Sequence, residues 1–264
     1  MCAQNIHSTA FVAPAARLGS NVKIGPFTDI GPEVEIGDDC EIMSHVVITG
    51  TVKIGAGAKI YPHAVLGCEP QNNRHRGGKT ALVIGRNCTI REGVTMHRGS
   101  DDSKGITVIG DNCLFLAYAH VAHDCIIGNN VTFANNVMVG GHVEIGDRVI
   151  IGGGGAVHQF VRVGHHAFVG GLAALVNDLI PYGSAIGVNA HLGGLNLIGM
   201  RRANMPRSEI HNVRHAVEML FDRTKTLSDR VIDVGCLYEG SPAVQDLLAF
   251  LNIKTKRSYC TPLV

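Results

Sequence analysis

The sequence predicts a parallel β-helix that is followed by a small α-helical domain. Isoleucine, valine or leucine stands at every sixth position from Ile6 to Leu66. A small residue stands two positions before most of them, and glycine often stands directly after. A strand that bends every six residues needs an aliphatic side chain inside and a residue without Cβ at the bend. Three such strands form one triangular coil, and neighbouring coils stack about 4.8 Å apart.

The hexapeptide period delimits the predicted β-helix. The period runs again from Ile109 to Leu175, and it fails beyond that point, where Pro181 interrupts the pattern. A change of composition follows, from strand-forming residues to amphipathic helical stretches. We therefore assign residues 1–191 to the β-helix and residues 192–264 to the α-helical C-terminal domain.

Two polar stretches interrupt the period, at residues 68–81 and 98–107. The first, CEPQNNRHRGGKTA, is basic and contains glycine, and the second, RGSDDSKGIT, includes a one-residue slip of the period. Insertions in a repeat architecture project from one face and often build its binding site. We expect both stretches to form projecting loops.

Helical periodicity predicts three helices in the C-terminal domain. Residues 207–223 place apolar side chains on one stripe, with Ser208 as the expected N-cap. Residues 227–237 favour a shorter helix, and Ser241 with Pro242 is typical of the start of another. We expect these helices to cover the end of the β-helix, where free strand edges would promote aggregation.

Composition narrows the class of protein. Hydrophobic residues make up 45% of the chain and aromatic residues only 5%, which suits a narrow core of Val, Ile and Ala. The chain does not open with a basic segment and an apolar run, and it has no stretch of about 18 apolar residues. With a formal net charge of +1, we expect a cytoplasmic protein with no integral membrane segment and no nucleic-acid partner.

Cysteine usage also favours the cytoplasm. Cys40, Cys88, Cys113 and Cys125 occupy the small position that Ala and Val fill elsewhere in the repeat. We interpret them as buried, reduced core residues. A buried Cys125 would be a poor nucleophile, which argues for direct attack by an acceptor over a covalent intermediate.

A cluster of histidines points to proton-transfer chemistry. The segment AHVAHDC contains His120, His123 and Asp124, and His142 follows nearly one coil later. Histidine exchanges protons near neutral pH, and an adjacent carboxylate can fix its tautomer. His97 and His158 stand where the repeat usually has glycine. Because local rules break repeatedly in this region, we expect a functional site here.

Two other functions remain open from the residues alone. A histidine-ligated zinc site, as in carbonic-anhydrase-like hydratases of this repeat class, would use several of these histidines. Against it, His120 and His123 lack the wider ligand spacing of that class. A non-catalytic scaffold would leave the clustered AHVAHDC and HQF segments unexplained.

Several segments are more specific than the hexapeptide period. They are IGPFTDIGPEVEIG (24–37), SHVVITG (44–50), VTMHRG (94–99), AHVAHDC (119–125), GGGGAVHQF (152–160) and the pair Arg201 and Arg202. With them the chain resembles, over essentially its whole length, the acyl-carrier-protein–UDP-N-acetylglucosamine O-acyltransferases that begin lipid A biosynthesis. The resemblance implies a left-handed β-helix, a homotrimer with active sites between subunits, and no metal or other cofactor.

The resemblance also implies the reaction. His123 would act as general base on the sugar 3-hydroxyl, supported by Asp124. The hydroxyl would attack the thioester of a long-chain (R)-3-hydroxyacyl group on acyl carrier protein, while the backbone N–H of Gly141 stabilises the oxyanion. Gly171 would leave room for the long chain. Matching substrate-binding positions are Gln71, Asn72, Arg74, His97, His120, His142, His158, Gln159, Gly171, Asn196, Arg201 and Arg202.

The sequence departs from the family in the first loop, which leaves two alternatives. Asn72 stands where the family has an aspartate that contacts the 3-position of the acceptor. An amide adds a hydrogen-bond donor and removes a charge, so the 3-amino-3-deoxy analogue is an alternative acceptor and would give an amide. Another alternative is a different hexapeptide acyltransferase, such as the N-acyltransferase that acts later in the pathway. That enzyme carries a domain before its β-helix, whereas here the repeat begins by Ile6.

Overall fold

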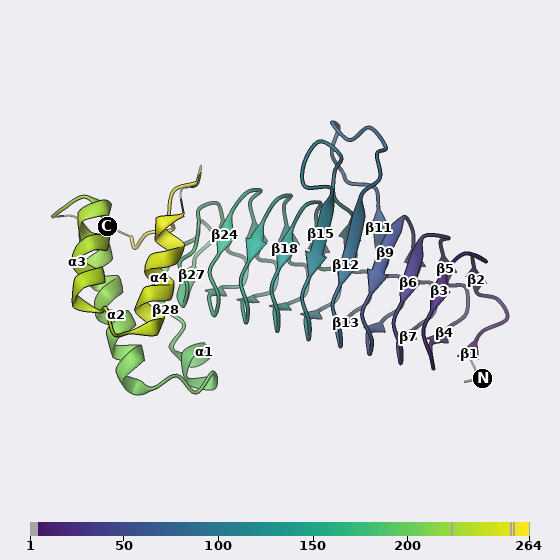
Figure 1. Cartoon of the computed structure of the whole chain (residues 1–264), viewed down its shortest axis with the longest axis horizontal. Helices are drawn as coiled ribbons and strands as arrows, with labels where there is room; N and C mark the ends of the chain where they lie inside the picture. Colours follow the sequence, from purple (N-terminus) through teal and green to yellow (C-terminus); the bar gives the residue numbers. More distant parts are fainter. Residues whose placement is uncertain (1–4, 223, 254, 256, 264) are drawn as a thin grey trace.

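Short strands wind into a three-sided prism, and the helices gather at its C-terminal end (Figure 1). The computed structural model describes residues 5–222, 224–253, 255 and 257–263. The first sheet contains β1 (Asn5–Ile6), β4 (Lys23–Ile24), β7 (Glu41–Ile42), β10 (Lys59–Ile60), β13 (Thr89–Ile90), β16 (Leu114–Phe115), β19 (Thr132–Phe133), β22 (Ile150–Ile151), β25 (Phe168–Val169), β27 (Gly183–Ile186) and β28 (His191–Leu195).

The two other sheets form the remaining sides of the prism. The second contains β2 (Phe11–Val12), β5 (Asp29–Ile30), β8 (Val47–Ile48), β11 (Val65–Cys68), β14 (Thr95–His97), β17 (His120–Val121), β20 (Met138–Val139), β23 (Ala156–Val157) and β26 (Ala174–Leu175). The third contains β3 (Arg17–Leu18), β6 (Val34–Ile36), β9 (Thr51–Ile54), β12 (Ala81–Ile84), β15 (Ile106–Ile109), β18 (Ile126–Ile127), β21 (Glu144–Ile145) and β24 (Arg162–Val163).

Strand register confirms the six-residue period. Ile24 pairs with Ile42, and Ile42 pairs with Ile60, in parallel strands of successive coils. These aliphatic side chains are buried, and so are Cys40 and Ala58 in the small inward position. Each fully buried aliphatic side chain contributes roughly 1.5–3 kcal/mol relative to an exposed one. The repeat therefore forms one continuous core along the prism.

The bends between strands repeat as regularly as the core. Asp124 and His142 have φ angles of 59° and 62°, in the left-handed region, and Phe160 has 65°. The N–H of His142 donates to the carbonyl of His123, and the N–H of Phe160 donates to the carbonyl of Gly141. Three successive coils therefore present Asp124, His142 and Phe160 from the same corner.

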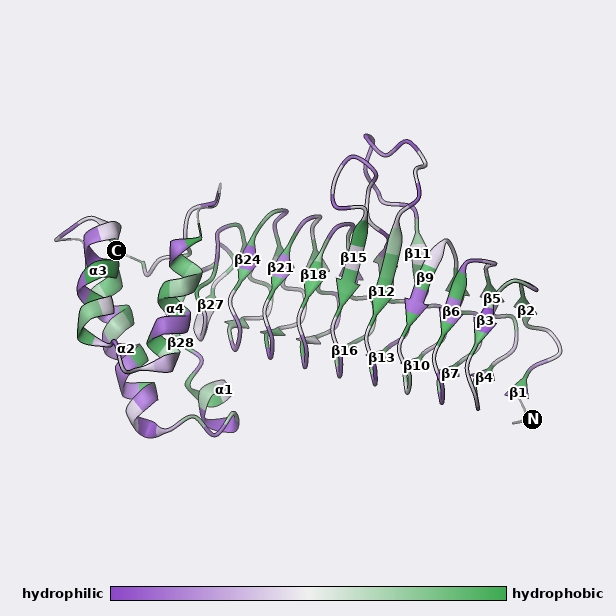
Figure 2. Cartoon of the chain, viewed as in Figure 1, coloured by the Kyte–Doolittle hydropathy of each residue, from purple (hydrophilic) through white to green (hydrophobic). Residues whose placement is uncertain are grey.

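Both predicted loops project from the prism, as Figure 1 shows between β11, β12 and β15. They lie beside one another because β12 pairs with β15 in parallel. The carboxylate of Asp101 accepts hydrogen bonds from the N–H groups of Arg76 (3.0 Å) and Gly78 (2.7 Å). Figure 2 shows that the loops are largely hydrophilic. The first loop is therefore fastened to the second through polar contacts.

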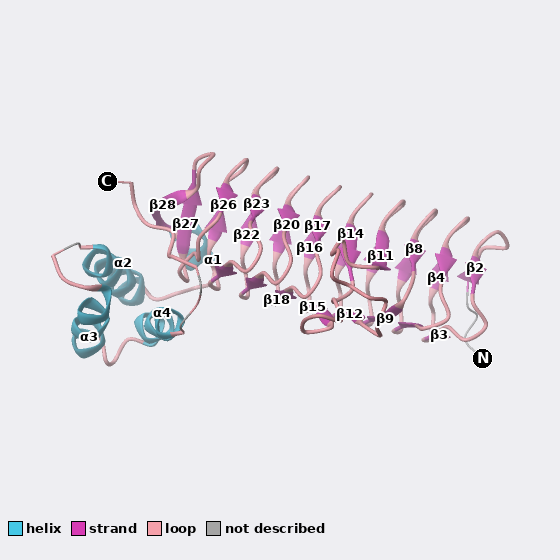
Figure 3. Ribbon diagram, turned by 90° about the horizontal axis from the view of Figure 1, so that it is seen from above, coloured by secondary structure: helices cyan, strands magenta, loops and turns pink. Residues whose placement is uncertain are grey.

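The C-terminal region contains the three expected helices and one more. The helices are α1 (Leu197–Arg202), α2 (Arg207–Phe221), α3 (Leu227–Leu237) and α4 (Pro242–Asn252). Seen from above, α2, α3 and α4 lie beyond the last coil of the prism (Figure 3). None of the helices in the described part of the chain has the length and apolar character that crossing a bilayer requires.

Helix starts differ in part from the sequence prediction. The expected N-cap Ser208 is wrong, because Pro206 occupies the N-cap position of α2 and Ser208 lies within the first turn. Ser241 precedes α4 as expected, but its hydroxyl donates to Glu209 Oε2 (2.8 Å). The same oxygen accepts the N–H of Ala243 (3.1 Å). A carboxylate from α2 thus caps α4. The predicted end of the first helix at position 223 lies outside the described residues.

Candidate active site

A cavity of about 720 Å³ runs along the second sheet of the prism. Its wall combines polar residues near the strand ends with apolar residues of β20, β23 and β26. Predicted site residues that line it are Gln71, His97, His120, His123, Gly141, His158 and Gln159. The fold therefore brings predicted site residues from the first loop and from four coils to one hollow.

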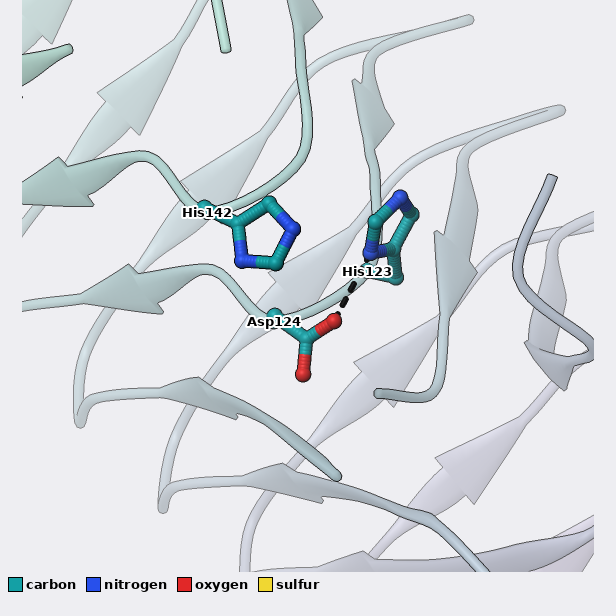
Figure 4. Close-up of side chains that lie close together, drawn as sticks. All are labelled: His123, Asp124 and His142. Atoms are coloured by element: carbon teal, nitrogen blue, oxygen red, sulfur yellow. Dashed lines mark hydrogen bonds and ion pairs between the residues drawn. The ribbon is translucent and has the colours of Figure 1, made fainter. Parts of the chain in front are cut away.

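His123 and Asp124 form a hydrogen-bonded pair in this cavity. Nδ1 of His123 lies 2.7 Å from Oδ2 of Asp124 (Figure 4). The Asp124 side chain is fully buried, whereas His123 keeps 13% of its side chain exposed. A carboxylate only accepts hydrogen bonds, so Nδ1 of His123 carries the proton and Nε2 has a free lone pair. His123 can therefore accept a proton through Nε2.

The second loop holds the Asp124 carboxylate in place. The backbone N–H groups of Ser100 (3.1 Å) and Gly105 (2.9 Å) donate to its two oxygens. The backbone N–H of Asp124 donates to the hydroxyl of Thr107 (2.8 Å). These contacts satisfy a buried charge that would otherwise be costly. Sequence reasoning missed all three loop residues, and the one-residue slip of the period was the available signal.

Gly141 lies directly beside the free nitrogen of His123. A Cβ placed on Gly141 would lie 2.8 Å from Nε2 and 2.8 Å from Cε1 of His123. Real Cβ atoms do not approach other atoms so closely, so a side chain here would push against the imidazole. Glycine allows the backbone of this coil to approach the reacting nitrogen.

His142 packs against His123 from the next coil. The two rings are edge-to-face with centroids 5.0 Å apart, and His142 stacks on Phe160 at 4.4 Å. Burial lowers the pKa of His142. One ligand atom from each of His123, Asp124 and His142 lies within 4.8 Å of the others, as in a metal site. A metal ion would have to displace the His123 N–H from the Asp124 carboxylate, which already binds two backbone N–H groups.

His97 and His120 form a second, neutral pair. Their ring centroids are 5.3 Å apart. Nδ1 of His97 lies 2.6 Å from the carbonyl oxygen of Glu69, so it donates, and Nδ1 of His120 lies 2.7 Å from Oγ1 of Thr95. Burial lowers the pKa of His97 and lowers the pKa of His120 to about 4. Both rings act as hydrogen-bonding groups at neutral pH, not as cations.

Cys125 is buried beneath the site, as the sequence predicts. Burial raises the pKa of its thiol to about 12. Its sulfur lies 3.2 Å from the carbonyl oxygen of Gly140, within the core. A thiol held this way forms almost no thiolate at neutral pH. The imidazole of His123 is therefore a better candidate for the reactive group of this cluster than the thiol of Cys125.

Asn72 and Arg74 do not line the cavity of His123. Nδ2 of Asn72 donates to Oγ of Ser100 (3.0 Å) and to Oδ1 of Asp102 (3.0 Å). Oδ1 of Asn72 accepts the N–H of Arg74 (3.0 Å). Within this chain, Asn72 therefore serves to join the two loops.

Other predicted residues also lie apart from this cavity. Asn196 caps α1 by accepting the N–H of Gly199 (3.0 Å), and Arg201 and Arg202 lie in the last turn of α1. His142 lines a neighbouring hollow of about 700 Å³. Among the described residues, those that line the His123 cavity do not include Gly171, Asn196, Arg201 or Arg202.

Comparison with known families agrees with the motifs. The family described as "Udp N-acetylglucosamine O-acyltransferase; Domain 2" matches residues 178–260. The hexapeptide repeats of bacterial transferases match residues 15–50, 35–68 and 106–141. These matches include the prism as well as the C-terminal helices.

Individual relatives and solved structures cover nearly the whole chain. The acyl-[acyl-carrier-protein]–UDP-N-acetylglucosamine O-acyltransferase of Bartonella henselae is 62% identical over 99% of this chain and 96% of its own length. The enzyme of that name from Brucella ovis is 65% identical over 97% of this chain and 92% of its own length. The structure of UDP-N-acetylglucosamine O-acyltransferase from Moraxella catarrhalis is 37% identical, with a TM-score of 0.93 over 97% of this chain and 99% of that chain. The fold is thus the left-handed β-helix of these enzymes, and the chain belongs to the acyl-[acyl-carrier-protein]–UDP-N-acetylglucosamine O-acyltransferase family.

Proposed function

We propose that this enzyme transfers a long-chain (R)-3-hydroxyacyl group from acyl carrier protein to the 3-position of UDP-N-acetylglucosamine, as the first step of lipid A biosynthesis. Its relatives from Bartonella henselae and Brucella ovis are named for this pair of substrates, which supports the proposal. The observation that carries the proposal is the His123–Asp124 pair at 2.7 Å, with its basic nitrogen beside Gly141 in a large cavity.

In this mechanism His123 accepts the proton of the acceptor hydroxyl at Nε2. The oxygen attacks the thioester carbonyl, a C–O bond forms, the C–S bond breaks, and the proton passes to the departing thiolate. Asp124 stabilises the imidazolium that forms transiently. The N–H of Gly141 is the donor that we assign to the oxyanion, because a Cβ on Gly141 would lie only 2.8 Å from Nε2 of His123.

The apolar part of the cavity suits the acyl chain. Met138 and Val139, then Ala156 and Val157, then Ala174 and Leu175 come from paired strands of three successive coils. The side chains of Met138, Ala156 and Ala174 form an apolar strip along the axis of the prism, whereas those of Val139, Val157 and Leu175 are buried in the core. Gly171 precedes the last of these strands, where a residue without a side chain would leave room for a long chain.

We propose that the active unit is a homotrimer. Phe27, Tyr118 and Leu172 are 61%, 67% and 72% exposed, respectively. Each has a positive φ and lies at a bend of its coil. Exposed apolar side chains of this size favour burial against another protein surface over contact with water. A neighbouring subunit would also bring Asn196, Arg201 and Arg202 toward the site. Light scattering of the purified protein, with Tyr118→Arg as the disrupting variant, tests this assembly.

We also propose a cytoplasmic location. The described cysteines are free, and most are buried in the core, which fits a reducing compartment.

A second acceptor is supported by the residue at position 72. Asn72 offers an amide where the resemblance leads us to expect a carboxylate, and its Nδ2 lies 3.0 Å from Oδ1 of Asp102. Because Asn72 does not line the His123 cavity of its own chain, it would contact the acceptor only at a site shared with a neighbouring subunit of the proposed trimer. In that arrangement the 3-amino-3-deoxy analogue of the sugar nucleotide, which would receive the chain as an amide, is the alternative substrate.

One assay tests both acceptors. Purified protein is incubated with long-chain 3-hydroxyacyl carrier protein and with either UDP-N-acetylglucosamine or its 3-amino analogue, and the product is identified by mass. His123→Ala serves as the inactive control. An ester product supports the first proposal, and exclusive amide formation supports the alternative. No product from either sugar, with folded protein, would overturn both.

A further inference from the structure

We infer that Arg257 is a positioning residue of the active site, which fixes the tautomer of His158. The expected effect on enzyme kinetics rests on the proposed function, whereas the tautomer of His158 does not depend on it. Arg257 lies 99 residues after His158, in the segment that follows α4. Neither the repeat nor the resemblance assigned it a role.

Arg257 contacts three residues that line the cavity. Nη2 of Arg257 lies 2.6 Å from Nδ1 of His158 and 2.9 Å from the carbonyl oxygen of Gln159. Nη1 lies 3.5 Å from the carbonyl oxygen of Val176. His158, Gln159 and Val176 all belong to the wall of the His123 cavity. The guanidinium therefore holds together three residues of that wall through hydrogen-bonding contacts.

The contact with His158 selects one tautomer. Nδ1 of His158 also lies 3.2 Å from the carbonyl oxygen of Gln159, which could accept a hydrogen bond from a protonated Nδ1. A guanidinium only donates, and its distance to Nδ1 is shorter. Nδ1 is therefore the acceptor, and the ring proton sits on Nε2.

The segment that carries Arg257 is fixed to the last coil through Asp178. The N–H of Asp178 donates to Ser258 O (2.9 Å), and the N–H of Cys260 donates to Asp178 O (2.8 Å). The Asp178 carboxylate is fully buried and accepts Nε of Arg162 (2.9 Å) and the hydroxyl of Thr255 (3.1 Å). Because both flanks of Arg257 are held, its guanidinium is preorganised against His158.

The selected tautomer determines what His158 can bind. With the proton on Nε2, the ring can donate to an oxygen of the sugar nucleotide, such as a hydroxyl, carbonyl or phosphate oxygen. Without Arg257, Nδ1–H can donate to the carbonyl oxygen of Gln159, and Nε2 becomes an acceptor that repels a carbonyl or phosphate oxygen. Loss of one such hydrogen bond weakens binding by about tenfold. The effect belongs to binding of the sugar nucleotide, not to proton transfer at His123.

Kinetics of a double-mutant cycle test this inference. Arg257→Met should raise the KM for the sugar nucleotide about tenfold and change kcat by less than about twofold, whereas Arg257→Lys should recover part of the loss. In a His158→Ala background, Arg257→Met should have no further effect. Arg148→Met, which removes an exposed arginine outside the cavity, is the matched control. Independent, additive losses would overturn the inference.

A second measurement needs no turnover. Spectra of protein with ¹⁵N-labelled histidines, with the His158 signal assigned through His158→Ala, should show Nδ1 without a proton in the wild type. Arg257→Met should shift this signal, whereas Arg148→Met should not. A protonated Nδ1 in the wild type would contradict the inference even if the enzyme is active. A wild type that shows the expected signal but forms no product would leave the tautomer assignment standing and refute the proposed function.

Discussion

The backbone N–H of Ser100 lies 3.1 Å from Oδ2 of Asp124, the same oxygen that binds His123. A residue of the second projecting loop thus helps to set the position of the base. The loop contributes a second donor, Gly105, to the other carboxylate oxygen. The insertion that interrupts the repeat therefore supports the candidate active site through its backbone, although its side chains do not line the His123 cavity.

Removing the base should abolish turnover without unfolding the protein. His123→Ala deletes a side chain that is 13% exposed and lines the cavity, outside the aliphatic core of the prism. We expect the rate to fall by about 10² to 10⁴-fold, the usual contribution of a positioned general base. Initial rates with both substrates saturating, and thermal unfolding, measure the two effects. A folded variant that keeps a near wild-type rate would refute the role of His123.

Replacing Asp124 should cost both activity and stability. In Asp124→Asn, one carboxylate oxygen becomes an NH₂ group that faces the N–H of Ser100, of Gly105 or of His123. Two donors then meet in a buried site, which costs about 1–3 kcal/mol. Denaturant unfolding should report this loss, and kcat should fall because the imidazolium is less stabilised. Asp39→Asn, at an exposed bend with positive φ, is the control. Equal effects at both positions would argue against a special role for Asp124.

A methyl group on Gly141 should impair catalysis more than folding. The new Cβ would meet Nε2 of His123 at 2.8 Å, and the imidazole is the more mobile partner. We expect Gly141→Ala to lower kcat at least tenfold, because the base moves away from the acceptor hydroxyl. Gly240→Ala, where nothing lies within 4 Å of the new Cβ, should leave kcat unchanged. Unchanged turnover in Gly141→Ala would mean that His123 reacts from another position.

The fold could be read from the sequence because the repeat is local. Ile24, Ile42 and Ile60 fill the same position in successive coils, so the pattern that predicts one coil predicts the next. The start of α2 could not be read as well. Ser208 and Pro206 are both common at helix starts. The conformation of the segment between α1 and α2 determines that the helix begins after Pro206.

The candidate site could be predicted where its residues lie on the repeating coils, as His97, His123 and His158 do. His123 and Asp124 are adjacent, so their pairing was visible. Ser100 and Arg257 reach the site from a loop and from the C-terminal segment, 24 residues from Asp124 and 99 residues from His158, respectively. Their contacts depend on the conformation of irregular segments, which no period encodes. The contacts of Asn72 could not be predicted for the same reason, since its partners Ser100 and Asp102 lie in the other loop.

Stability should fall as the solution becomes mildly acidic. Burial, reinforced by nearby His97 and His123, lowers the pKa of His120 from 6.5 to about 4. Between these values the unfolded chain binds a proton at His120 that the folded chain does not, so protons favour unfolding. The free energy of unfolding should therefore decrease as the pH falls from 6.5 to about 4, and His97 and His142 act in the same direction.

Urea unfolding between pH 7 and pH 4 measures this dependence. His120→Gln removes the titrating group and should flatten the curve, whereas His7→Gln, at an exposed position, should leave it unchanged. Because Nδ1 of His120 lies 2.7 Å from Thr95 Oγ1, glutamine can keep a hydrogen bond at this site. The comparison therefore separates the effect of proton binding at His120 on stability from the effect of changed packing. If His120→Gln shows the same pH dependence as the wild type, His120 is not the source of the acid sensitivity.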